Sequence, residues 1–225
     1  AILIGGTIGL IFGARISERY KTTVIAGMGL FTVVMGLQMF LKSGNQLIVL
    51  GALIIGALIG EWLKIEDRLQ AFGQAIEQRF SQEAETGTGS KFVRGFMVAS
   101  LLFSIGPMAI LGSIQDGLTG DYNLLAVKST LDGFASIAFA STLGVGVLFS
   151  SIITLIYQGG ISLLAGQLSA IVTEPMMNEM TATGGVILLG LAISNLLEIR
   201  KIRVGNFLPA LAVAPLIVWI IEVLK

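Results

Sequence analysis

The feature that most constrains this chain is its division into long apolar blocks joined by short polar segments. Each block is about 15 to 25 residues long, and about 20 helical residues are needed to cross the hydrocarbon core of a bilayer. Hydrophobic residues make up 54% of the sequence and charged residues 12%, about half the charged share of a soluble domain. We therefore expect an all-α protein, a polytopic bundle of transmembrane helices.

The spacing of the apolar blocks predicts about eight spans. Their expected residue ranges are 1–14, 22–41, 45–63, 92–112, 133–157, 159–173, 183–199 and 204–224. The first range is too short for a full crossing and begins inside an apolar run, so we interpret it as a truncated helix and not as a signal peptide. The sixth range is also short, which is consistent with a tilted, re-entrant or buried segment.

Basic residues are unevenly distributed between the segments that join these spans. If the spans alternate in direction, eleven of the 14 Lys and Arg residues fall on one side, and only Lys42, Lys128 and Lys225 fall on the other. Loops rich in Lys and Arg remain in the cytoplasm. We therefore expect a multi-pass protein of the bacterial cell (inner) membrane. The expected cytoplasmic segments are residues 14–21, 64–91 and 199–203.

The sequence contains a candidate internal duplication. The stretch "GALIIGALIGEWLKI" (51–65) aligns with "GVILLGLAISNLLEI" (185–199), which matches Gly56 with Gly190. Because four spans is an even number, the two copies have the same orientation, so we expect two parallel four-helix repeats related by an axis along the membrane normal. The expected parts are a first repeat at 1–112, an extracytoplasmic connection at 113–132 and a second repeat at 133–225.

Small residues recur at four-residue spacing in several of the expected spans, as in Gly5, Gly9 and Gly13. Such faces let helix backbones approach closely where lipid supplies no hydrophobic drive. They predict tight packing within the bundle or a homodimer formed through the glycine-rich faces. Lining of a solute path is a further alternative.

Residues 65–80 place Ile65, Leu69, Phe72 and Ile76 on one helical stripe. This pattern predicts an amphipathic cytoplasmic helix that lies on the bilayer surface, covers the bundle or meets a partner. The polar residues 81–90 that follow are typical of a flexible linker.

The fourth expected span contains the dipeptide Gly106–Pro107. Proline has no amide hydrogen and frees a carbonyl one turn earlier, close to Ser104. Unwound backbone at membrane depth persists only where protein or a water-filled cavity satisfies it. We expect the span to unwind or kink here and to contribute to an ion or solute path. The alternative is a kink that only shapes packing.

Charged residues follow this stretch. Lys128 and Asp132 share a helix face, and with Asp116 we expect them to form an extracytoplasmic vestibule. The alternative is that Asp132 caps a helix and pairs locally with Lys128. Hydroxyl groups would continue the vestibule inward and, with freed carbonyls, suit a hard cation such as sodium. These hydroxyl groups belong to Ser136, Ser141 and Thr142, with Ser104 close to the proline.

Glu61 is a carboxylate near the cytoplasmic end of the third expected span, and its counterpart in the repeat is Asn195. An intramembrane carboxylate is a functional candidate, so we expect the two side chains to face each other across the pseudo-axis. The alternative is that Glu61 reaches the interface and is solvated there.

The composition excludes several functions. The sequence has no Cys and no His, so thiol catalysis, histidine proton relays and Cys/His metal sites are absent, and we expect no cofactor and no metal site. A net charge of zero gives no basic field for nucleic acid. No nucleophile–base pair is evident, so we do not expect an enzyme.

Three motifs carry a family resemblance: "GSIQDGLTGDY" (112–122), "KSTLDG" (128–133) and "FASTLGVGVLFS" (139–150). With the glycine-rich opening, they resemble the bacterial integral membrane proteins grouped as domain of unknown function 554. That family is generally labelled as candidate transporters, which implies a multi-pass membrane protein and assigns no binding residues.

We therefore expect a secondary transporter or exporter of a small solute, coupled to an ion gradient and working in the lipid bilayer. The alternative is a structural or assembly membrane protein that packs against partner subunits and transports nothing.

Overall fold

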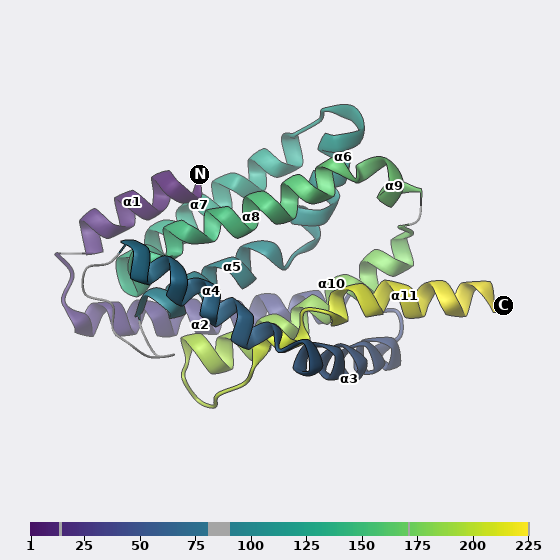
Figure 1. Ribbon diagram of the computed structural model, residues 1–225, viewed down its shortest axis with the longest axis horizontal. Coiled ribbons are helices and arrows are strands. Elements are labelled where there is room, and N and C mark those ends of the chain that lie inside the picture. The colour runs from purple at the N-terminus through teal and green to yellow at the C-terminus, as the bar shows by residue number, and fades with distance from the viewer. Residues whose placement is uncertain (14, 81–90, 171, 225) are drawn as a thin grey trace. The chain divides into compact units, whose positions relative to one another are not determined.

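The computed structural model describes residues 1–13, 15–80, 91–170 and 172–224, and within these ranges it contains helices and no strand (Figure 1). The predicted all-α class is confirmed. Six helices are long and apolar enough to cross a membrane, and a seventh span results if one bent helix pair is counted as a single crossing. The expected count of eight is therefore not reached by length and composition. The expected linker 81–90 lies outside the described residues.

The chain divides into two compact units. Unit 1 comprises residues 1–27 and 69–168, and unit 2 comprises residues 28–68 and 169–225. Each unit combines segments from both ends of the sequence, so these units do not follow the expected sequential halves 1–112 and 133–225.

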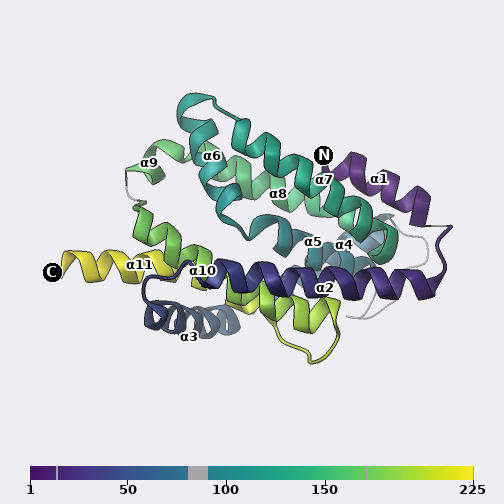
Figure 2. The same ribbon diagram turned by 180° about the vertical axis from the view of Figure 1, so that it is seen from behind.

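The helices of unit 1 are α1 (Ile2–Gly13), α5 (Lys91–Ser104), α6 (Pro107–Thr119), α7 (Asn123–Leu143), α8 (Gly146–Leu163) and the short α9 (Ala165–Ser169). Helix α1 runs beside α7 in both views (Figure 1, Figure 2). A Cβ added at Gly5 would lie 2.1 Å from the carbonyl oxygen of Gly133, and Gly9 and Gly13 approach the α7 backbone similarly. This glycine-rich face is therefore covered inside the chain.

The helix bounds in unit 1 differ from three expected segments. The expected span 133–157 is cut by Gly144, which has φ 83° and ends α7. Glycine adopts this left-handed conformation without a Cβ penalty, and it commonly ends helices for that reason. The expected connection 113–132 is mostly helical, because α6 continues to Thr119 and α7 begins at Asn123. The expected sixth span, 159–173, contains only the end of α8 and α9.

Helix α4 (Ile65–Phe80) has the bounds that its amphipathic pattern predicts. In unit 1, Leu69 and Ile76 pack against the buried cluster of Phe92, Val93, Phe96 and Met97 on α5. The rings of Phe72 and Phe96 lie 5.9 Å apart, centroid to centroid. The apolar stripe of α4 therefore covers the helix bundle, which is one of the three roles expected for it.

Unit 2 contains most of α2 (Glu18–Phe40), α3 (Gln46–Leu63), α10 (Glu174–Leu191), a π-helical segment η1 (Ala192–Leu196), a 3-10 turn η2 (Val204–Phe207) and α11 (Ala210–Val223). Its core includes Ala52 of α3 and Ala210, Val213 and Ala214 of α11. Gly56 packs against Ala210, whereas the nearest contact of Gly190 is Val204. Gly56 and Gly190, which the repeat alignment matches, therefore have different neighbours and do not pack against each other.

Candidate functional site

The fourth expected span is broken. Helix α5 ends at Ser104, α6 begins at Pro107, and the two helices are bent by 60°. This bend confirms the predicted kink at Gly106–Pro107. The kink arises because Pro107 has no amide hydrogen and cannot donate the backbone hydrogen bond that would continue α5. Its missing N–H is harmless at the first position of a new helix.

The break leaves backbone oxygen atoms without helix partners. Ile105 N–H donates to Leu101, and Ala109 N–H donates to Gly106. Among the described residues, no backbone N–H donates across the break to the carbonyl groups of residues 102–105. The final carbonyls of a helix need other partners, and at membrane depth lipid supplies none.

Five buried side-chain atoms in the described part of the chain have no hydrogen-bond partner, and all five lie on α5, α6 and α8. They belong to Ser100, Ser104, Ser113, Thr154 and Gln158. Leaving a buried polar group unsatisfied costs about 1 to 3 kcal/mol, so native structures keep few of them. The unpartnered groups are therefore concentrated on three helices of unit 1.

Contacts at the start of α8 set its register against α5. An added Cβ at Gly146 would touch the Phe92 carbonyl and the Phe96 amide, so this end of α8 lies beside that part of α5. Ser104 follows Phe96 by about two helical turns, and Thr154 follows Gly146 by the same distance. Because both helices run in the same direction from this contact, Ser104 and Thr154 lie at the same level, beside the break.

A second contact sets the register at the other end. An added Cβ at Gly117 would lie 2.0 Å from the Ser162 carbonyl oxygen, and the hydroxyl of Ser162 donates to the carboxylate of Asp116 at 2.8 Å. Ser113 lies about one turn before Gly117, and Gln158 lies about one turn before Ser162. Ser113 and Gln158 therefore form another level of the same arrangement.

Together these residues form what we call the polar column. On α8, four polar residues follow one another at four-residue spacing and so share one helix face. Figure 2 shows α6 leading away from the end of α5 beside α8. The members of the polar column are Ser100, Ser104, Ser113 and Asp116 on α5 and α6, and Ser150, Thr154, Gln158 and Ser162 on α8.

The hydroxyl groups expected on α7 are not part of this column. Ser136 donates to the Asp132 carbonyl at 2.6 Å, and Ser141 and Thr142 donate to the Ala138 carbonyl. Each is therefore satisfied by its own helix. The next residue, Leu143, packs against Gly95, more than two turns of α5 before Ser104. The expected convergence of these hydroxyls on Ser104 is not found.

Lys128 and Asp132 form an ion pair within α7, in which Lys128 is buried and Asp132 is partly buried, with side chains 9% and 14% exposed. The predicted local pairing is confirmed, but the predicted helix cap is wrong, because α7 begins at Asn123, more than two turns earlier. Asp132 therefore lies inside α7 and not at its start.

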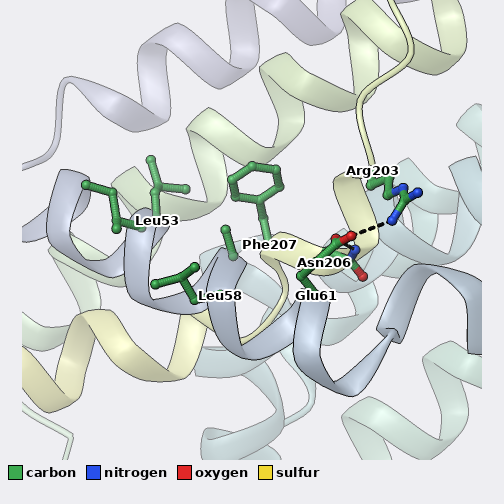
Figure 3. A pocket seen from close by; sticks show the side chains of 8 residues that line it. Leu53, Leu58, Glu61, Arg203, Asn206 and Phe207 are labelled. Carbon is green, nitrogen blue, oxygen red and sulfur yellow. Dashed lines mark hydrogen bonds and ion pairs between the residues drawn. The ribbon is translucent and has the colours of Figure 1, made fainter.

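Glu61 forms a different cluster, in unit 2. Its carboxylate accepts from the Arg203 guanidinium and from the Asn206 amide (Figure 3). These partners replace the expected apposition with Asn195, which lies in η1. Beside them is an open groove of about 450 Å³ with mostly apolar walls, including Leu53, Leu58 and Phe207 (Figure 3). Such a lining is less suited to a polar solute than the polar column.

Sequence reasoning missed two features. Glu179 of α10 is 3% exposed and accepts from Ser43 Oγ at 2.8 Å and from the amides of Gly44 and Asn45. An acidic residue inside a mostly apolar helical stretch, and not only at its start like Glu174, was a signal for it. The α8 stripe was also detectable, because its polar residues recur every four positions within an apolar block.

The polar column consists of hydroxyl and amide groups and one carboxylate, that of Asp116. In the described ranges, no three His, Cys, Asp or Glu side chains gather as a metal site. Hydroxyl groups both donate and accept, and free carbonyls accept. The polar column can therefore bind a small polar molecule or a cation that prefers oxygen ligands.

The sequence matches the model of the family described as "Protein of unknown function (DUF554)" over residues 1–219. The chain belongs to this family. It is 30% identical to the Uncharacterized membrane protein YdfK of Bacillus subtilis (strain 168), covering 98% of this chain and 93% of that protein. It is also 30% identical to the Uncharacterized protein YqgA of Escherichia coli (strain K12), covering 95% of this chain and 91% of that protein.

No solved structure matches the chain. The family membership, the membrane relative and the six long apolar helices together identify a multi-pass membrane protein.

Proposed function

We propose that this protein is a secondary transporter or exporter, which moves a small polar solute along the polar column and is coupled to an ion gradient. The observation that carries the proposal is the gathering of five unpartnered, buried polar atoms on α5, α6 and α8. A scaffold gains nothing from buried groups that lack partners, since each lowers stability. A transport path needs such groups, because a passing solute satisfies them in turn.

The broken span supports the same reading. Secondary transporters bind substrates and coupling ions at discontinuous helices, where unwound carbonyls and the positive ends of half-helices face the ligand. Helices α5 and α6 form such a pair beside Thr154. No enzymatic reaction belongs to the proposal.

The proposal includes an eight-span topology in the bacterial inner membrane. The six long helices, the bent pair α5–α6 and the shorter apolar helix α1 make eight membrane elements in chain order. This order keeps the segments 14–21, 64–91 and 199–203, which carry most of the basic residues, on the cytoplasmic side. Elements one to four and five to eight then form the two proposed parallel repeats.

A single-cysteine pair tests this topology, since the native chain has no cysteine. Ser17→Cys should resist a membrane-impermeant maleimide added to intact cells, whereas Lys42→Cys should react. The reverse pattern would invert the proposed orientation.

The proposal needs no second copy of the chain. The glycine faces expected to form a homodimer are occupied within it, by α7 in the case of α1 and by Ala210 and Asn206 in the case of α3. We propose that any homodimer uses a different surface.

The decisive experiment compares two serines that are both fully buried, Ser113 of the polar column and Ser136 of α7. Purified protein in proteoliposomes is screened for solute uptake under sodium and proton gradients. Ser113→Ala should reduce uptake by about tenfold or more, because the solute loses a hydroxyl partner, while Ser136→Ala should retain it. Equal uptake by both variants, or no gradient-dependent uptake of any solute, would favour the structural or assembly role.

A further inference from the structure

The polar groups at the break between α5 and α6 are hydroxyl and carbonyl oxygens, and none of these groups is charged. The register of α5 and α8 places Ser104 and Thr154 at a similar level, and the hydroxyls of both have no partner although each residue is only 9% exposed. The carbonyls of residues 102–105 receive no backbone hydrogen bond across the break. Buried acceptors at two kinds of group, side chain and backbone, therefore point to a common ligand.

A cation is the ligand that this set favours. Carbonyl oxygens accept and cannot donate, so a run of them is satisfied by donors or by a positive ion. Rings of carbonyl and hydroxyl oxygens replace the hydration shell of alkali cations in channels and transporters. A neutral solute with several hydroxyl groups is the competing ligand.

The charge of the site selects a monovalent ion. Tight protein sites for Ca²⁺ and Mg²⁺ include carboxylates. The column's one carboxylate, Asp116, bonds to Ser162 about two turns of α8 beyond Thr154. The partly buried Asp132 is already paired with Lys128.

We propose that the α5–α6 break is a sodium site, with Ser104 Oγ, Thr154 Oγ1 and carbonyl oxygens of residues 102–105 as ligands. The site deepens the proposed function, because it names the coupling ion and where the ion binds. A bound sodium ion satisfies the unpaired oxygen acceptors at the break and so links α5 and α6 to α8.

The chain supplies a matched control. Thr154 and Thr142 are both 9% exposed, but the hydroxyl of Thr142 is satisfied by the Ala138 carbonyl of its own helix. Replacing threonine by valine removes the hydroxyl and nearly preserves the volume. Thr154→Val therefore removes a proposed ligand, whereas Thr142→Val removes only a local hydrogen bond.

The test measures ²²Na⁺ binding to the full chain in detergent by equilibrium dialysis. Thermal unfolding is measured in parallel in sodium, potassium or choline chloride at equal ionic strength. Sodium should bind saturably and raise the Tm above its value in choline chloride. Thr154→Val should weaken binding about tenfold or more, Thr154→Ser should restore it, and Thr142→Val should change it less than about twofold.

Absence of saturable ²²Na⁺ binding to the native chain would overturn the site, and so would equal binding by Thr154→Val. If Thr154→Val fails to fold, Ser104→Ala in the same assay decides. Failure of the proposed function gives a different result. Sodium binding without gradient-driven solute uptake would keep the site and remove the transporter, whereas uptake that needs Ser113 but no sodium would do the reverse.

Discussion

The two units differ in how completely their buried polar groups are paired. In unit 2, Glu179 accepts three hydrogen bonds, and Glu66 accepts from the amide of Gly205 at 2.6 Å. No buried side-chain atom without a partner is found among the described residues of unit 2, whereas unit 1 has five. Other buried polar groups of unit 1 do have partners, as in the Lys128–Asp132 pair and the hydroxyl of Ser136, so the unpartnered groups are confined to α5, α6 and α8. Under the proposed function, the paired groups of unit 2 hold the fold together and the unpartnered groups of unit 1 bind the solute or ion.

The largest expected effect concerns the Lys128–Asp132 ion pair of unit 1. Lys128→Met leaves Asp132 as an unpaired, partly buried charge, so the free energy of unfolding should fall by about 3 to 5 kcal/mol. Unfolding in mixed SDS micelles measures it. The double variant Lys128→Met/Asp132→Leu should recover most of the loss. A single variant as stable as the native protein would show that the pair is not structural.

A somewhat smaller loss is expected in unit 2. Glu179→Ala removes the acceptor for Ser43, Gly44 and Asn45 and should lower the free energy of unfolding by about 2 to 4 kcal/mol. Glu174, exposed on the same helix, is the control, and Glu174→Ala should change stability by less than about 0.5 kcal/mol. Uptake per folded molecule should be unchanged in both. A transport defect in folded Glu179→Ala would show that this buried carboxylate of unit 2 contributes to transport and not only to stability.

The smallest expected effect has opposite signs in two serine variants. Ser113→Ala removes an unsatisfied hydroxyl and should raise the free energy of unfolding by up to about 1 kcal/mol, although it impairs uptake. Ser136→Ala removes a satisfied one and should lower it by about 1 kcal/mol. The same micelle titration measures both. Destabilisation by Ser113→Ala would mean that this hydroxyl has a structural partner.

Local features of this fold could be predicted from the sequence. The bounds of α4 follow from its amphipathic period, and the break at Gly106–Pro107 follows from the missing amide of proline. The end of α7 at Gly144 was missed, because a glycine inside an apolar run does not reveal whether its φ is positive. Of the polar column, only Ser104 and Asp116 were among the candidates.

The rest of the site depends on contacts between distant segments. Thr154 and Gln158 look like isolated polar residues in an apolar helix, and only the close packing of Gly146 and Gly117 brings them level with α5 and α6. The partners of Glu61 and Glu179 lie more than 130 residues away in sequence. No local pattern encodes such a pairing, because it depends on which helix faces meet.

The packing of α1 on α7 has a consequence for biosynthesis. A ribosome adds about 5 to 20 residues per second, and about 110 residues separate the end of α1 from the start of α7. The glycine face of α1 therefore stays uncovered by α7 for roughly 5 to 20 seconds, until α7 has been synthesised and leaves the translocon. During that interval lipid or an insertion chaperone occupies the face, so assembly of unit 1 requires that occupant to be displaced.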